Sequence, residues 1–305
     1  MPPPLRTRLT AHLALLATAV AWGASFVVVQ DALATLSPHT LLVLRFGLAA
    51  AALAAAGAAA GRLRAGSATW WAGAGVGVWL YAGFALQTLG LGFTTPARSG
   101  FLTGVYVLLV PLTQRGLGVR VPPRVAVAAG LGFTGLALLT RPQAWSDVNP
   151  GDVLTLLCAV GFAGHVVVLG RAATRHPPLP LAVAQLAAVG ALSVPGAVAE
   201  TLSGIELAPA AAEAAPGAAA VAGGLLFLGL VCSGGAYLAQ SFAQRVVAPT
   251  PTALWLSLEA VFAALVSVAL GRERLLPVEW LGGGLMVAAV VLAQLPARPS
   301  REKPS

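Results

Sequence analysis

Residues 254–265 read Leu254-Trp-Leu-Ser-Leu-Glu-Ala-Val-Phe-Ala-Ala-Leu265, an apolar run with one carboxyl group, that of Glu259, near its centre. A helix that starts near Thr250 and rises about 1.5 Å per residue would carry Glu259 about 14 Å into a hydrocarbon layer about 30 Å thick. An ionisable group at that depth is costly, and a chain keeps one there when something polar must meet it. The run therefore predicts a membrane-spanning helix with a functional acid near its midpoint.

The composition of the whole chain agrees with a membrane environment. Of 305 residues, 58% are hydrophobic and 9% are charged, with a mean hydropathy of +0.85, whereas soluble domains carry about 25% charged residues. The net charge of +8 could suggest nucleic acid, but the arginines lie in short clusters between apolar runs and form no continuous basic face. These features predict an integral membrane protein that does not bind nucleic acid.

Ten apolar segments can be counted because prolines and arginines separate them, and most have the roughly 20 residues needed to cross a bilayer. Proline at the start of six of them suits the first turn of a helix, where its missing N–H is harmless. The expected fold is all-α, with ten transmembrane helices over residues 12–30, 38–60, 69–92, 96–114, 123–140, 152–171, 178–199, 217–245, 251–270 and 277–295.

The basic residues predict the orientation of the chain. With both termini in the cytoplasm, most arginines fall in cytoplasmic loops, as the positive-inside rule requires. Arg98 and Arg141 fall outside, and so do the two arginines of Gly271-Arg-Glu-Arg274, which is the weakest point of this orientation. The first segment is preceded by Arg6 and Arg8, but it continues through Phe26-Val-Val-Val29 past any cleavage site, so we expect a membrane span and no removed signal peptide.

The two halves of the chain resemble each other. Trp22-Gly-Ala-Ser-Phe-Val-Val-Val29 aligns with Phe162-Ala-Gly-His-Val-Val-Val-Leu169 at an offset of 140, which pairs Arg45 with Gln185, and an offset of 153 pairs Gln87 with Gln240 and Tyr106 with Glu259. Five helices per half reverse the direction of the second half. The sequence thus predicts an inverted repeat, with one half at 1–145 and the other at 146–305, and a central site that both sides of the membrane reach in turn.

The ordered motifs resemble the drug/metabolite transporter superfamily, specifically its EamA-like ten-helix members. They are Ala21-Trp-Gly-Ala-Ser-Phe26, Leu44-Arg-Phe46, the run from Leu89 to Tyr106, and Ser257-Leu-Glu-Ala-Val-Phe-Ala-Ala264 followed by Gly271-Arg-Glu-Arg-Leu275. The resemblance covers nearly the whole chain and implies solute movement without ATP hydrolysis, commonly export of amino acids, metabolites or toxic compounds. Family members often have proline after the helix-nine glutamate, and Ala260 here predicts the loss of a kink.

Three ionisable residues within the segments have competing interpretations. Glu259 would line a cavity and carry a coupling proton, or would lock helices together through hydrogen bonds. Arg45 lies about 10 Å below the outer surface by helical rise and would extend outward to the interface, the favoured interpretation, or pair with an acid. His165 would relay protons or bond a carbonyl group.

The remaining candidates are uncharged. Gln87 and Gln240 are amides in apolar helices, suited equally to binding a substrate and to joining helices. Trp22 is interpreted as packing more readily than as stacking on a solute, and Ser25 is the small residue that matches His165 in the repeat. Together with Glu259, Tyr106, Arg45 and His165, these four complete the set of predicted substrate-binding or coupling residues.

The sequence therefore predicts a secondary transporter, and more specifically an exporter, in the cytoplasmic membrane of a bacterium. Its partners would be a small-molecule substrate, the lipid bilayer and a coupling proton, and it would be a monomer or a homodimer. No cofactor or metal is expected, because Cys158 and Cys232 show no ligand spacing and no phosphate-binding loop occurs. The alternatives are a membrane-embedded enzyme, for which His165 with Ser25 or Ser233 is the suggestive set, and a pore or non-transporting subunit.

Overall fold

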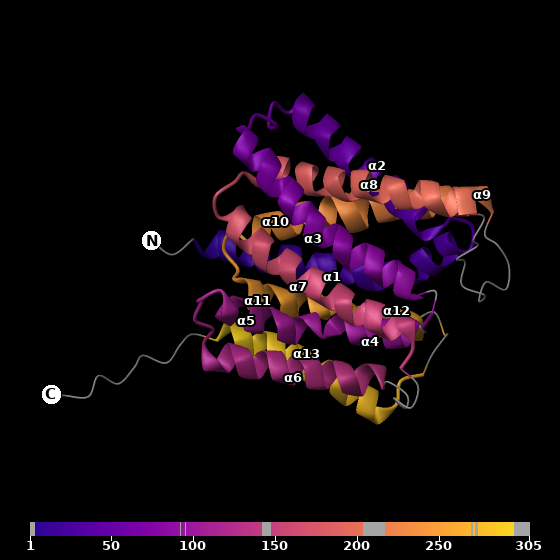
Figure 1. Cartoon of the computed structure of the whole chain (residues 1–305). Helices are drawn as coiled ribbons and strands as arrows, with labels where there is room; N and C mark the ends of the chain where they lie inside the picture. The colour runs from indigo at the N-terminus through magenta and orange to yellow at the C-terminus, as the bar shows by residue number, and fades with distance from the viewer. Residues whose placement is uncertain are drawn as a thin grey trace.

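The computed structural model describes residues 4–91, 93–94, 96–141, 148–203, 217–269, 271 and 274–295. All regular structure in these ranges is helical (Figure 1). The helices are α1 (Leu5–Leu33), α2 (Pro38–Ala59), α3 (Ser67–Leu91), α4 (Pro96–Gly104), α5 (Tyr106–Gly116), α6 (Pro123–Thr140), α7 (Pro150–Ala173), α8 (Pro178–Ser203), α9 (Ala218–Leu226), the π-helix η1 (Phe227–Gly235), α10 (Ala236–Ala243), α11 (Pro249–Ser257), α12 (Glu259–Ala269) and α13 (Pro277–Gln294).

Each of the ten predicted apolar segments falls on helix. Eight helical stretches within the described ranges are long and apolar enough to cross a membrane. Two of these stretches combine several helices, since Ala218–Ala243 contains α9, η1 and α10, and Pro249–Ala269 contains α11 and α12. The other two predicted segments are α1 and the pair α4 and α5. The predicted boundary between Trp145 and Ser146, the residues Arg272 and Glu273, and the tail 296–305 lie outside the described residues.

Four predicted helix starts were too late by two residues or more. The first segment begins at Leu5 and not at His12, and the third begins at Ser67 and not at Thr69. The ninth segment begins at Pro249 and not at Pro251, because both prolines are tolerated in a first turn. The sixth begins at Pro150, since Asn149 caps it: the Asn149 side chain accepts a hydrogen bond from the Asp152 backbone N–H at 3.0 Å, and the Asp152 carboxylate accepts one from the Asn149 N–H at 3.0 Å. Such a reciprocal cap satisfies two donors that would otherwise lack partners.

The helices pack as a bundle with α1 through its middle. The pairs α2–α8 and α6–α13 form opposite edges, and α1 contacts α10, α11 and α12 between them (Figure 1). In the same way α7 contacts α3, α4 and α5. The first turn of α1 and the last turn of α13 lie at the same end of the bundle (Figure 1).

The fourth and ninth segments are both interrupted in the middle. Val105 separates α4 from α5, and Leu258 separates α11 from α12. Each interruption contains a tightened turn, in which the Val105 N–H bonds to the Leu102 carbonyl at 3.2 Å and the Leu258 N–H bonds to the Trp255 carbonyl at 3.3 Å. The two residues are 153 positions apart, the same offset that pairs Tyr106 with Glu259.

The interruption at Leu258 is a tightened turn whose backbone stays in the right-handed helical region, with φ −61° and ψ −11°. The loss of a kink through Ala260 therefore stays a prediction. Neither interruption has a proline directly after Tyr106 or Glu259. A tightened turn with a bond to the third preceding residue is enough to end one helix and start another.

Candidate functional site

Glu259 is the first residue of α12 and lies directly after the break at Leu258. Its side chain is half-buried and forms no hydrogen bond or ion pair with any residue that the structure describes. The backbone of α1 packs tightly on this turn, since a Cβ atom at Gly23 would lie 2.8 Å from the Glu259 carbonyl oxygen. The partial positive charge at a helix start favours a carboxylate there.

Tyr106 occupies the corresponding position at the start of α5. It is 5% exposed, and its hydroxyl donates a hydrogen bond to the Ala253 carbonyl of α11 at 3.2 Å. The structure therefore joins the two interrupted segments, and Tyr106 interacts electrostatically with both Glu259 and Tyr237. Of the predicted site residues, Tyr106 and Glu259 are brought together.

Tyr237 of α10 is the centre of an aromatic cluster that also contains Trp22, Phe46, Phe84 and His165. The distances from the Tyr237 ring centroid are 5.4 Å to Trp22, 6.2 Å to Phe46, 6.5 Å to Phe84 and 5.6 Å to His165. The Trp22 indole N–H donates to the Cys232 carbonyl of η1 at 2.7 Å, which holds α1 against this cluster. Four segments, α1, α2, α3 and α7, thus present rings to one tyrosine.

Arg45 is buried beside this cluster, and the prediction that it extends outward was wrong. Its side chain is held because the Arg45 Nε–H donates to the Ser233 hydroxyl at 2.6 Å, and because the guanidinium lies 5.3 Å from the Phe46 ring centroid and 5.2 Å from that of Phe84. It forms no ion pair with any described acid, so the alternative interpretation also fails. Tyr237 interacts electrostatically with both Arg45 and Glu259, so the cation, the tyrosine and the acid form one connected region.

His165, whose ring centroid lies 5.6 Å from that of Tyr237, forms part of a buried polar chain. Its Nε2 lies 2.9 Å from the Gln185 side-chain oxygen, and the Gln185 amide donates to the Ser241 hydroxyl at 3.0 Å. The carbonyl group that His165 was predicted to bond is therefore the side-chain carbonyl of Gln185. This chain ties α7 to α8 and α10.

The three remaining predicted residues make local or interhelical bonds. Gln87 donates to the Thr103 hydroxyl at 2.9 Å and so joins α3 to α4, while the Ser25 hydroxyl donates to the Trp22 carbonyl at 2.8 Å. Gln240 is fully buried and donates to the Gln244 side chain at 3.2 Å, and its own side-chain oxygen has no partner among the described residues. None of the three bonds to Glu259.

Three features of the region escaped prediction from the sequence. Tyr237 and Gln185 were not among the predicted site residues, and Ser233 was considered only as part of the set for an enzyme. The repeat carried a signal for Gln185, because it is the residue that the offset of 140 pairs with Arg45. The set proposed for an enzyme is not assembled by the described hydrogen bonds, since Ser233 bonds to Arg45, Ser25 to Trp22 and His165 to Gln185.

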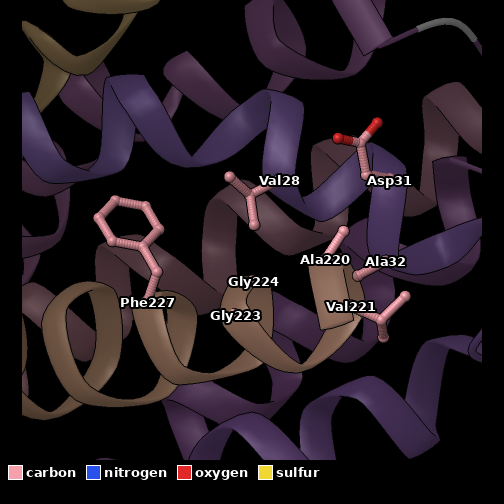
Figure 2. Close-up of a pocket in the computed structure, with 8 residues that line it drawn as sticks. All are labelled: Val28, Asp31, Ala32, Ala220, Val221, Gly223, Gly224 and Phe227. Carbon is pink, nitrogen blue, oxygen red and sulfur yellow. The ribbon is translucent and has the colours of Figure 1, made fainter. Parts of the chain in front are cut away.

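A separate pocket of about 290 Å³ lies between the end of α1 and α9. Figure 2 shows Val28 and Phe227 facing the same space, with the Asp31 carboxylate directed away from Phe227. None of the predicted site residues lines it. The lining consists of Val28, Asp31, Ala32, Ala220, Val221, Gly223, Gly224 and Phe227.

Comparison with known proteins identifies the family. A model of the EamA-like transporter family matches residues 9–141 and again residues 149–295. The chain belongs to the EamA-like transporter family. It is also 31% identical over 292 residues to an "Uncharacterized transporter" of Archaeoglobus fulgidus, a match that covers 94% of this chain and 87% of the relative. Membership of a transporter family points to a membrane transporter and away from an enzyme.

A solved structure described as "Crystal structure of protein" resembles this EamA-like transporter with a TM-score of 0.75. The two are 22% identical, and the match covers 94% of this chain and 97% of that one. At this identity the likeness concerns the fold alone.

Proposed function

We propose that the chain is a secondary transporter that exports small metabolites, amino acids or drug-like solutes by alternating access at a central site. In this proposal ten transmembrane helices form two inverted five-helix repeats, at 1–145 and 146–305, in the cytoplasmic membrane of a bacterium with both termini inside. The observation that carries it is the pair of interrupted helices with Tyr106 and Glu259 at their central starts. Interrupted helices at half-depth are typical of solute sites in secondary transporters.

The packing of the bundle supports the two-repeat arrangement. The contacts of α7 with α3, α4 and α5 correspond to those of α1 with α10, α11 and α12, as expected when the first and sixth segments are equivalent. The pairs α2–α8 and α6–α13 each join equivalent segments of the two halves. Two such halves can exchange inward-open and outward-open shapes around one fixed site.

Glu259 is the proposed coupling residue. Its carboxyl group has no hydrogen bond or ion pair within the described part of the chain, which argues against a purely structural role as a link between helices. A carboxyl group without a fixed partner is free to bind either a proton or a cationic group of the solute. Tyr106 and Tyr237 would form the sides of the same site.

Purified protein in proteoliposomes tests this function. Uptake of a panel of amino acids and cationic drugs would be measured with and without a pH gradient, and at least one solute should show saturable flux. Glu259→Gln should lower that flux at least about tenfold, which corresponds to about 1.4 kcal/mol, and should abolish its response to the gradient. Asp31→Asn is the matched control, because it removes the charge of an exposed acid outside the site.

Each arm has an outcome that contradicts the proposal. A wild-type protein without saturable flux of any solute would overturn transport itself. A folded Glu259→Gln variant with wild-type flux across the whole pH range would remove Glu259 from the mechanism.

A further inference from the structure

Arg45 is a buried cation whose charge no part of the described chain neutralises. The residue is 5% exposed, and its one hydrogen bond to a described residue uses a single guanidinium donor out of five, the Nε–H that binds Ser233. The titratable side chains that act on its charge are those of Tyr237 and Cys232, and neither is ionised at neutral pH. Burying a charge in this way is costly unless an opposite charge is supplied.

The surroundings hold the guanidinium in one orientation. The Ser233 hydroxyl accepts the hydrogen bond of the Nε–H, and the ring centroids of Phe46 and Phe84 lie 5.3 Å and 5.2 Å from the guanidinium carbon. The two terminal amino groups therefore remain available as a planar pair of donors. Such a pair matches the two oxygens of a carboxylate.

Ser233 itself lies in the π-helix η1, and Tyr237 follows one turn later. Short π-helical segments occur frequently at functional sites. The rings of Trp22, Phe46 and Phe84 surround Tyr237 and form an apolar surface beside the guanidinium. A solute with an acidic head and an apolar body would satisfy both features.

We infer that Arg45 binds the carboxylate of the transported solute, with the apolar body of that solute against the aromatic cluster around Tyr237. This inference rests on the proposed transport function and narrows its substrate to carboxylates. One guanidinium balances one negative charge, and no second cation is among its electrostatic neighbours in the described chain, so a phosphate dianion is a poorer match. Arg45 is thus assigned as the residue that selects the acid.

Three probes of similar shape test the assignment: phenylacetate, phenylacetamide and phenethylamine. Equilibrium dialysis with the purified full-length protein would measure binding of each. We expect phenylacetate to bind at least about tenfold more tightly than the amide, because a hydrogen bond between a guanidinium and a carboxylate is stronger than one to a neutral amide. Arg45→Gln should remove this preference, while Arg120→Gln, which removes the same charge from an exposed loop, should retain it.

A wild-type protein that does not prefer the acid, or a folded Arg45→Gln variant that keeps the preference, would overturn the assignment. If Arg45→Gln does not fold, Arg45→Lys tests the assignment in its place. Lysine keeps the charge but loses the planar fork, so the preference should fall several-fold, and an unchanged preference would overturn the inference.

Flux measurements separate this inference from the proposed function. Arg45-dependent binding of phenylacetate with no saturable flux of any probe would overturn transport but leave the carboxylate site. Saturable flux of phenethylamine that Arg45→Gln does not change would support transport and overturn the carboxylate site.

Discussion

Two residues of opposite charge lie in the centre of this bundle without an ionic partner in the described chain. Glu259 starts a helix, and Arg45 is held between two phenylalanine rings. Tyr237 interacts electrostatically with both. A buried charge without a partner destabilises a protein in lipid. For this reason we assign Arg45 to the carboxylate of the solute, and Glu259 to a proton or a cationic group of the solute.

A different buried pair shows what a structural ionisable contact looks like in the same molecule. His39 is the second residue of α2, and Glu200 lies near the end of α8, with the His39 Nδ1 at 2.5 Å from one Glu200 carboxylate oxygen. The other oxygen accepts the His39 backbone N–H at 3.0 Å. Both side chains are 7% exposed, so this contact holds α2 to α8 out of water.

Glu200→Ala should therefore destabilise the protein by about 3–5 kcal/mol, the usual effect of removing one partner of a buried pair. Glu200→Gln should cost less, because an amide oxygen can still accept the His39 N–H. Thermal unfolding of the detergent-solubilised protein, followed by size-exclusion chromatography, measures both. A Glu200→Ala variant that unfolds at the wild-type temperature would show that the contact contributes nothing.

The interrupted helices are the elements on which the function depends. Val105 and Leu258 break two helices at equivalent positions, and each break ends with a polar residue at the start of the next helix. The Tyr106 hydroxyl donates a hydrogen bond to the Ala253 carbonyl, which lies on the same segment as Glu259. The long helix pairs at the edges, in contrast, have no break and serve as a frame.

The α6–α13 pair depends on close backbone contact. A Cβ atom at Gly282 would lie 2.5 Å from the Leu139 N and 2.6 Å from the Gly135 carbonyl oxygen, whereas one at Gly284 would meet nothing within 4 Å. Small residues let helices approach in this way where lipid gives no hydrophobic drive for association.

Gly282→Ala should then destabilise the protein by about 1–3 kcal/mol through overpacking, and Gly284→Ala should leave stability unchanged. Thermal unfolding in detergent distinguishes the two. Equal unfolding temperatures for both variants would mean that α13 moves away from α6 without cost.

For the whole molecule, the proposed topology predicts which loops face the cytoplasm. Alkaline phosphatase is active only outside the cytoplasm, so fusions after Ser203 and within the loop at Gly271 should be active, and fusions after Arg175 and at the carboxyl terminus should be inactive. Green fluorescent protein fusions should show the reverse pattern. A cytoplasmic loop at Gly271 would contradict the ten-helix arrangement.

The sequence by itself determined the membrane class, the ten apolar segments and the family, because hydropathy and proline placement depend on local composition. It also paired Tyr106 with Glu259, since an internal repeat is visible as an offset. It did not predict the break at Leu258 without proline, or the burial of Arg45 against Ser233 and Phe84. Those depend on contacts between helices far apart in the chain: Ser233 is 188 residues from Arg45, and only packing in three dimensions decides which side chain meets which.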